Sequence, residues 1–198
     1  MKRGRLFIVS GPSGVGKSTV LKALLERREN ARFSISATTR PIREGEIDGV
    51  HYHFISAETF REWIAQEAFL EYAEYVGNFY GTPRKFVEAA LDAGQDILLD
   101  IEVQGAMQVK ERMPDAVKIF IGPPSWKELE RRLTSRGTNT PEDIGKRLAR
   151  AKVETRAAKA YDYLVVNDAV ENAVGELDAI ITAEHCRPKE RTELFEDA

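Results

Sequence analysis

The stretch GPSGVGKST, Gly11 to Thr19, constrains the fold of this chain more than any other part of the sequence. It follows a short apolar run, Leu6 to Ser10, and precedes a segment in which apolar residues recur at helical spacing. The predicted order is therefore strand, glycine-rich loop and helix. Such a loop packs few side chains, so its use must lie in the backbone shape that it allows or in what its N–H groups hold.

Within this loop, Gly11, Gly16, Lys17 and Ser18 satisfy the pattern G-x-x-x-x-G-K-[ST]. A plain turn would not need a Lys-Ser pair at the start of the helix. Successive N–H groups at the positive end of a helix bind phosphate oxygens. We therefore predict that the loop binds a nucleoside triphosphate, with Lys17 at the β- and γ-phosphates and the Ser18 hydroxyl on Mg²⁺.

The composition of the chain excludes several classes of protein. Its 198 residues carry a net charge of −3, which argues against a general binder of nucleic acid or of a membrane surface. The one cysteine, Cys186, excludes an internal disulfide and fits a reducing compartment. No apolar run is long enough for a signal peptide or a membrane span. We expect a cytoplasmic protein of one domain with excursions, and no nucleic-acid or membrane partner.

Further apolar runs at 97–101, 117–121 and 163–166 alternate with helix-like segments, which predicts an α/β fold with a parallel sheet. Ligands gather at the carboxyl ends of such strands. Asp100 stands at that end, where a carboxylate that organises Mg²⁺ would sit, and Glu102 would face the same side if the strand continued. The alternative for either acid is a cap on the following turn.

Two stretches interrupt this alternation and differ in charge. Residues 34–83 hold eight acidic and three basic side chains, a net charge of −5, whereas residues 123–156 hold nine basic and five acidic ones, a net charge of +4. The basic stretch reads as helix, loop and helix, with a capping-box pattern from Ser125 to Glu128 and a second helix start at Pro141. Four arginines gather about its loop: Arg132, Arg136, Arg147 and Arg150.

A solvated charged face is one interpretation of these arginines. Beside a phosphate-binding loop, a second interpretation gains weight, because phosphoryl transfer is catalysed mostly by positioning and by cations that offset the charge of the transferred group. We therefore predict a mobile, arginine-rich lid.

The acidic stretch 34–83 contains the elements of a second phosphate site. Arg40, Arg43 and Tyr52 are residue types that bind phosphate together. Glu71 stands in an apolar run, where a solvent-facing position is the plain alternative. A carboxylate accepts two hydrogen bonds, however, and this matches the paired N–H donors on the edge of guanine.

The two neighbouring histidines and the C-terminal tail are not expected to form sites. His51 and His53 are two residues apart and would share one side of a strand, but without a third ligand in view we expect no metal site there. The polar tail after His185 is expected to fray.

Taken together, these segments resemble the guanylate kinase family from Leu6 to about Ala183. The motifs that carry the resemblance are GPSGVGKST, S-x-x-T-T-R-x-x-R-x-G-E, FLEYA, G-N-x-Y-G-T, LLDIE-x-QGA, RL-x-x-RGT and VVND. The resemblance implies a P-loop core flanked by helices, with an inserted monophosphate-binding region and a helical lid. Its predicted division is a core of 1–33, 84–122 and 155–198, a GMP-binding insertion of 34–83 and a lid of 123–154.

The resemblance also implies the role of each site residue. ATP would be bound by Gly11, Pro12, Ser13, Gly14, Val15, Gly16, Lys17, Ser18, Thr19, Asn167 and Asp168. Guanine would contact Ser36, Glu71 and Thr82. The GMP phosphate would contact Arg40, Arg43, Tyr52 and Tyr80. The acid pair between the two nucleotides would be Asp100 and Glu102. Mg²⁺ would contact Ser18 and Asp100. The catalytic set would be Lys17, Arg40, Arg132, Arg136 and Arg147. One residue departs from the family pattern, since Glu102 stands where an aspartate is usual.

The reaction implied is in-line transfer of the γ-phosphoryl group of ATP to GMP with Mg²⁺, which makes the chain a kinase of purine nucleotide metabolism. Two other functions stay open. A non-catalytic guanylate-kinase-like interaction module would have lost the ATP loop, and a P-loop kinase acting on a sugar phosphate would not need the guanine contacts. The oligomeric state and the use of dGMP are open as well.

Overall fold

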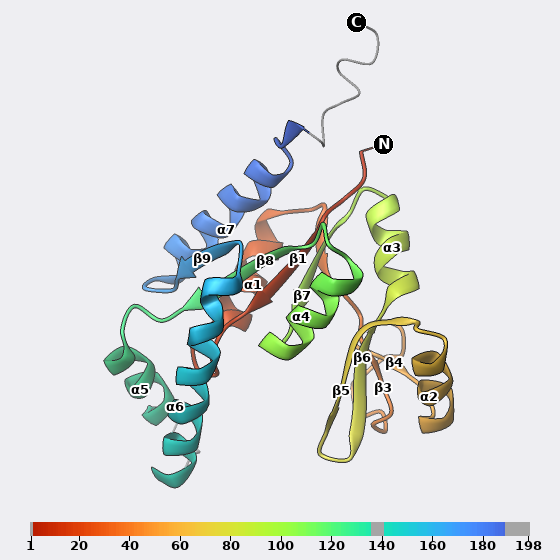
Figure 1. Cartoon of the computed structure of the whole chain (residues 1–198), viewed down its shortest axis with the longest axis horizontal. Coiled ribbons are helices and arrows are strands. Elements are labelled where there is room, and N and C mark those ends of the chain that lie inside the picture. Colours follow the sequence, from red (N-terminus) through yellow and green to blue (C-terminus); the bar gives the residue numbers. More distant parts are fainter. Residues whose placement is uncertain (1, 136–140, 189–198) are drawn as a thin grey trace, which may run out of the picture. The chain divides into compact units, whose positions relative to one another are not determined.

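The computed structural model describes residues 2–135 and 141–188 of the chain. The chain forms two compact units, one made of residues 1–10 and 30–119 and the other of residues 11–29 and 120–198. Strand β8 (Val117–Gly122) begins in the first unit and ends in the second. Each unit has its own helices and strands (Figure 1).

A parallel sheet forms the centre of the first unit. Strands β2 (Ala31–Phe33), β7 (Asp96–Asp100) and β1 (Leu6–Ser10) lie in this order. Phe7 of β1 pairs with Leu98 of β7. All of β1 and the first four residues of β7 are buried. Strands covered on both faces read as nearly unbroken apolar runs, which is why the sequence predicted them.

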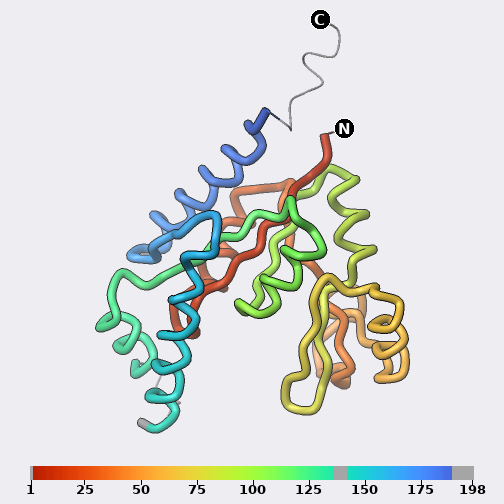
Figure 2. Tube along the Cα trace, viewed as in Figure 1, coloured from red at the N-terminus to blue at the C-terminus, as the bar shows by residue number. Residues whose placement is uncertain are grey.

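Two helices pack on these strands, α3 (Arg84–Asp92) on β7 and α4 (Val103–Arg112) on β1. In Figure 2 the N-terminal segment, drawn in red, passes the end of α3. There the Gly4 N–H donates to the Leu91 carbonyl over 2.7 Å. This contact fixes the segment that leads into β1 against α3.

The first unit also contains a second, four-stranded sheet of order β4-β3-β6-β5. Its strands are β3 (Ala37–Thr38), β4 (His53–Phe54), β5 (Phe69–Tyr75) and β6 (Asn78–Pro83). The long hairpin β5–β6 is antiparallel and β3–β4 is parallel. Helix α2 (Ala57–Ala65) covers this sheet through Phe60, whose ring stacks on Phe69 at 4.4 Å. The sheet gives residues 37–83 a small core of their own.

The second unit is mostly helical. It contains α1 (Lys17–Arg27), α5 (Trp126–Thr134), α6 (Pro141–Arg156), the 3-10 turn η1 (Ala157–Ala160), β9 (Tyr163–Val166) and α7 (Val170–Glu184). Strand β9 is a neighbour of β8, and α1 packs against α7. Leu129 and Leu133 of α5 pack with Ala151 of α6 in a separate small cluster.

Most elements expected from the sequence are confirmed. The apolar runs at 6–10, 97–101, 117–121 and 163–166 are strands, displaced by at most one residue. Helix α5 begins after Ser125, whose hydroxyl accepts a hydrogen bond from the Glu128 N–H as the capping pattern predicted. In the part of the chain that the structure describes, no helix combines the length and the apolar character that crossing a membrane requires.

One local expectation is wrong. Strand β7 ends at Asp100, and Glu102 is the N-cap residue of α4, so Glu102 does not continue the strand. The chain turns there earlier than an apolar pattern alone can indicate. Tyr52 lies just before β4 and makes an isolated bridge with Asp48.

Candidate active site

The glycine-rich loop of the second unit leads directly into α1, which begins at Lys17. Gly14 and Gly16 have φ angles of 88° and 92°, a left-handed conformation that favours glycine. A Cβ added at Gly16 would stand 2.7 Å from Asn167 Nδ2. Glycine is therefore required at position 16 both for the turn and for the close approach of Asn167. No acidic residue occupies the first turn of α1, so its N-terminus suits an anion.

The side chains of Asn167 and Arg132 hold the carbonyl of Val15 in this loop. Asn167 Nδ2 donates to it over 2.7 Å and Arg132 Nη1 over 3.1 Å. Arg132 Nη2 also donates to the Asn167 carbonyl, at 3.1 Å. Asn167 is 3% exposed, and its Oδ1 has no hydrogen-bond partner in the described part of the chain. The glycine-rich loop is therefore braced by Asn167, which follows β9, and by Arg132 of α5.

A cavity of about 300 Å³ lies beside this brace. Its lining contains Gly14, Gly16, Thr19, Arg132, Ser135, Asn167, Asp168 and Val170. The structure thus brings together three residues of the loop, Arg132 and the Asn167-Asp168 pair. The loop residues and the Asn-Asp pair belong to the predicted ATP-binding set, and Arg132 to the predicted lid. The Asp168 carboxylate accepts from the Ala169 N–H over 2.6 Å, and this bond is the main cause that lowers the pKa of Asp168.

The predicted lid arginines differ in their surroundings. Arg132 is half-buried and donates through Nε to Glu128 over 2.8 Å. Hydrogen bonds from Arg131 and then Arg132 lower the pKa of the Glu128 carboxyl to about 2. Arg147 lies half-buried on α6. Arg136 lies outside the described residues.

The first unit holds a cavity of about 570 Å³ that is lined by two of the three predicted guanine-binding residues, Ser36 and Glu71, while the third, Thr82, lies behind Glu71 and bonds to it. Its lining includes Ser36, Tyr52, Glu71, Tyr80 and Glu102, which come from five separate segments of the chain, together with Gln104, Gly105 and Gln108 of α4. The structure thereby assembles most of the predicted GMP site within one unit.

Glu71 is the buried carboxylate of this cavity. It is 8% exposed on β5 and lies opposite Thr82 of β6. The Thr82 hydroxyl donates to Glu71 Oε1 over 2.6 Å. Burial raises the pKa of Glu71, while the hydrogen bonds from Thr82 and the charge of Arg112 oppose part of this rise. The carboxylate therefore keeps acceptor capacity for a ligand that brings N–H donors.

Arg40 is held close to this cavity by a carboxylate that the sequence analysis did not single out. Its guanidinium forms a bidentate pair with Glu46, at 3.0 and 2.7 Å, and lies 5.5 Å from the centre of the Tyr52 ring. The Arg43 N–H also donates to Glu46, at 2.8 Å, and the Arg43 side chain is exposed. Hydrogen bonds from Arg40 lower the pKa of Glu46 to about 2. The rings of Tyr52 and Tyr80 meet edge to face, which completes a cationic and aromatic corner.

Ser18 and Asp100, the residues predicted to bind Mg²⁺, lie in different units. Ser18 is exposed in the first turn of α1, and Asp100 is exposed at the carboxyl end of β7. Hydroxyl and carboxylate oxygens are the hard donors that Mg²⁺ prefers, so each of the two side chains is of a type that fits this ion. Glu102 is exposed at the start of α4.

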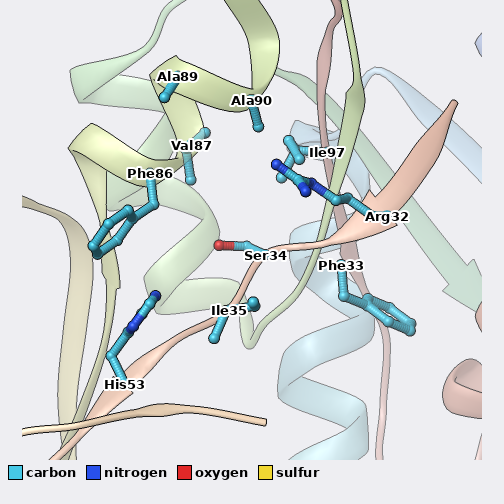
Figure 3. Close-up of a pocket in the computed structure, with 10 residues that line it drawn as sticks. All are labelled: Arg32, Phe33, Ser34, Ile35, His53, Phe86, Val87, Ala89, Ala90 and Ile97. Carbon is cyan, nitrogen blue, oxygen red and sulfur yellow. The ribbon is translucent and has the colours of Figure 1, made fainter. Parts of the chain in front are cut away.

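Figure 3 shows a further cavity of the first unit, of about 250 Å³, between α3 and residues 32–35. None of the predicted site residues lines it. His53 faces Phe86 there, with ring centres 4.3 Å apart (Figure 3). His51 Nδ1 instead accepts a hydrogen bond from the Ile47 N–H, so the two histidines have separate local partners.

Comparisons with known proteins agree with this geometry. The family model described as guanylate kinase matches residues 3–184. The chain is 52% identical to the guanylate kinase of Halalkalibacterium halodurans over 98% of this chain and 95% of the relative. It is 55% identical to that of Thermus thermophilus over 99% of this chain and 89% of the relative. The crystal structure of guanylate kinase from Anaplasma phagocytophilum is similar with a TM-score of 0.70 and 38% identity, and covers 94% of this chain and 88% of that one. The chain therefore belongs to the guanylate kinase family, a family of ATP:GMP phosphotransferases.

Proposed function

We propose that this chain transfers the γ-phosphoryl group of ATP to GMP. The bond between the γ-phosphorus and the oxygen that bridges it to the β-phosphate breaks, and its electron pair leaves on ADP. A new bond forms between the γ-phosphorus and an oxygen of the GMP phosphate, giving GDP. No general base is needed because the GMP phosphate attacks as an anion.

The observation that carries this proposal is the buried Glu71 carboxylate, held by Thr82 in the same cavity as Tyr52 and Tyr80. A carboxylate accepts from the N1–H and the 2-amino group of guanine, whereas adenine offers no such pair of donors. Ser36, in the lining of the same cavity, adds a hydroxyl for the base. The site therefore selects GMP by hydrogen-bond pattern as well as by shape.

The GMP phosphate binds at the corner formed by Arg40, Arg43, Tyr52 and Tyr80 in this proposal. Arg40 already has the fixed orientation that bidentate recognition of phosphate requires. Its pairing with Glu46 supports the proposal because it stops the arginine from sampling other rotamers. Binding then needs Arg40 to share its N–H donors between Glu46 and the phosphate.

ATP binds in this proposal through the N–H groups of residues 11–19, with Lys17 at the β- and γ-phosphates and the adenine beside Asn167 and Asp168. Ser18 and Asp100 would hold Mg²⁺, which when bound offsets charge on the phosphates. The lid arginines Arg132, Arg136 and Arg147 would stabilise the transferred group, and Glu102 would stay near the GMP.

We also propose the division of the chain into a P-loop core, a GMP-binding insertion of residues 34–83 and a lid of residues 123–154. The separate sheet and core of residues 37–83 support the insertion, and the separate cluster of Leu129, Leu133 and Ala151 supports the lid. Closure of these parts would exclude water that otherwise hydrolyses ATP. The cytoplasmic location and the lack of a nucleic-acid or membrane partner stay predictions from the sequence.

A coupled assay of ADP release tests the proposal. We expect turnover with GMP to exceed that with AMP, dTMP, UMP and CMP, and the same panel with dGMP decides whether the deoxy substrate is used. Equal or better turnover with AMP would refute the proposed acceptor. Activity on ribose phosphates alone would favour a sugar-phosphate kinase, and lack of ATP binding would favour an interaction module.

A further inference from the structure

Helix α4 lies against Glu71, the carboxylate that is proposed to bind guanine. Thr82 holds Oε1 of Glu71, and the other oxygen, Oε2, faces Gly105 of α4. A Cβ added at Gly105 would stand 3.1 Å from Oε2 and 3.5 Å from Glu71 Cγ. Such a contact is tighter than side chains normally make, and Glu71 is buried and hydrogen-bonded, so it cannot swing aside freely.

The backbone of Gly105 is helical and needs no glycine for its conformation. Gly175 of α7 differs from Gly105 in its surroundings. It is also a helical glycine, but a Cβ added there would meet nothing within 4 Å. The tightest contact of a Cβ at Gly105 would therefore be with the Glu71 carboxylate, while Ile101 Cδ1, at 3.5 Å, would be at ordinary van der Waals distance.

A second residue of α4 fixes the backbone that carries Glu71. Arg112 lies seven residues after Gly105, about two turns along the same face of the helix. Its Nη1 donates to the Leu70 carbonyl over 2.9 Å, and more weakly to Gln108 Oε1 at 3.4 Å. Leu70 directly precedes Glu71 on β5, so this bond holds the strand at the point where the carboxylate departs.

We infer that Gly105 and Arg112 are positioning residues that set specificity for a purine base with both an N1–H and a 2-amino group. Gly105 leaves room for Oε2 of Glu71, and Arg112 fixes the strand at Leu70. Together with the hydrogen bond from Thr82, these contacts set the position of the carboxylate. The inference rests on the proposed phosphorylation of GMP.

The discriminating measurement compares GMP with IMP, because IMP keeps the N1–H and lacks only the 2-amino group. Displacement of the carboxylate removes the contact that GMP makes and IMP does not. We expect Gly105→Ala to lower kcat/KM for GMP about tenfold or more, chiefly through KM, and to lower it much less for IMP. The ratio of the two substrates should therefore fall.

Loss of folding would not explain that result. Alanine is a better helix former than glycine, so the thermal midpoint of Gly105→Ala should not fall much, and its Kd for ATP should equal that of the unaltered chain. Gly175→Ala is the matched control and should keep both the KM for GMP and the GMP:IMP ratio. An unchanged ratio in Gly105→Ala, with GMP activity present in the unaltered chain, would overturn the inference.

Arg112 provides the second variant. Arg112→Met should lower the GMP:IMP ratio, and Arg112→Lys should restore part of it, because lysine still donates to the Leu70 carbonyl but without the fixed guanidinium geometry. Equal ratios in both Arg112 variants and the unaltered chain would remove Arg112 from the inference. A chain that binds ATP but phosphorylates neither GMP nor IMP would instead overturn the proposed function, and the positioning inference with it.

Discussion

The proposed GMP site has a carboxylate at the end that binds the base and another at the end that binds the phosphate, and their pKa values are shifted in opposite directions. At the base end, Glu71 is buried and its pKa is raised, so its charged form waits for donors that a ligand must supply. At the phosphate end, Glu46 is paired with Arg40 and its pKa is lowered to about 2, so its charge is already satisfied inside the protein. The base end therefore has hydrogen-bond acceptors left for the substrate, whereas at the phosphate end Arg40 already has a partner and must share its N–H donors with the substrate.

Beside the glycine-rich loop of the second unit, a carboxylate is also paired with arginines inside the protein, as Glu46 is. Glu128 pairs with Arg131 and Arg132, and its pKa is also about 2. Arg132 in addition holds the Val15 carbonyl. In each unit, one arginine predicted to meet a phosphate is therefore oriented by a carboxylate: Arg40 by Glu46 and Arg132 by Glu128.

Replacement of Glu71 should have the largest effect of the substitutions at the two ends of the site. Glu71→Gln should lower kcat/KM for GMP by at least about 100-fold, because an amide N–H would then face the N–H donors of guanine. ATP binding should survive, as isothermal titration will check. The control is Glu62→Gln on the exposed face of α2, which should stay within about twofold of the unaltered chain. Unchanged kinetics in Glu71→Gln would refute the assignment of the base contact.

The same variant tests the sign of the pKa shift through stability. Because the pKa of Glu71 is higher in the folded than in the unfolded chain, the folded chain binds more protons between the two values. Without GMP, the free energy of unfolding should therefore fall, relative to that of Glu71→Gln, as the pH rises from the ordinary pKa of a glutamate through the raised one. Urea denaturation at a series of pH values measures this slope, and the opposite slope would show that burial does not dominate at Glu71.

Arg132 carries the next largest expected effect. Arg132→Met should lower kcat about 100-fold with little change in the KM for GMP, because the residue braces the glycine-rich loop and, in the proposed reaction, supplies charge to the transferred group. Arg131→Met is the matched control, since Arg131 is 68% exposed in its side chain and pairs with the same Glu128. It should stay within about twofold. Equal losses in the two variants would mean that Glu128 pairing, and not the contact with the loop, is what matters.

A substitution at Thr82 tests whether its hydrogen bond keeps the Glu71 carboxylate ionised. Thr82→Val removes the hydroxyl that donates to Glu71 and so raises the pKa of Glu71 further. We expect the KM for GMP to rise about tenfold at neutral pH, and by more as the pH falls, since protonated Glu71 has lost acceptor capacity. A pH series of kcat/KM for GMP measures the effect. A profile that keeps its midpoint would contradict the role of this hydrogen bond.

The sequence predicted well those parts of the site that depend on residues close together in the chain. The order of strand, glycine loop and helix around Gly16 follows from local pattern, and so does the start of α5 at Ser125. The family resemblance added residues scattered over the chain, and Ser36, Tyr52, Glu71 and Tyr80 do line one cavity. Burial of Glu71 could not be read from its apolar neighbours alone, because a strand with one polar position fits either face.

Contacts over long sequence separations were not predictable from pattern. Asn167 was expected beside adenine, but its side chain also braces the Val15 carbonyl, 152 residues away. The β5–β6 hairpin was not predicted either, since its turn is Val76-Gly77 with φ angles of 49° and 72°, and valine seldom adopts that conformation. Glu46 was missed although it ends a quoted motif, because only the turn at Gly45 brings it back to Arg40.

Glu46 offers the smallest effect and the sharpest test of the phosphate end. Glu46→Gln should raise the KM for GMP about threefold, because Arg40 loses its orienting partner while keeping its charge. The pKa of Glu46 is lowered on folding, so the stability that this carboxylate contributes is present above the ordinary pKa of a glutamate and is lost as the pH falls toward about 2. The unaltered chain should therefore lose stability relative to Glu46→Gln in that acid window, and Glu44→Gln, an exposed neighbour, should show neither effect. A lower KM in Glu46→Gln would mean that Glu46 competes with the phosphate for Arg40. The Arg40–Glu46 pair would then have to break before the GMP phosphate could bind.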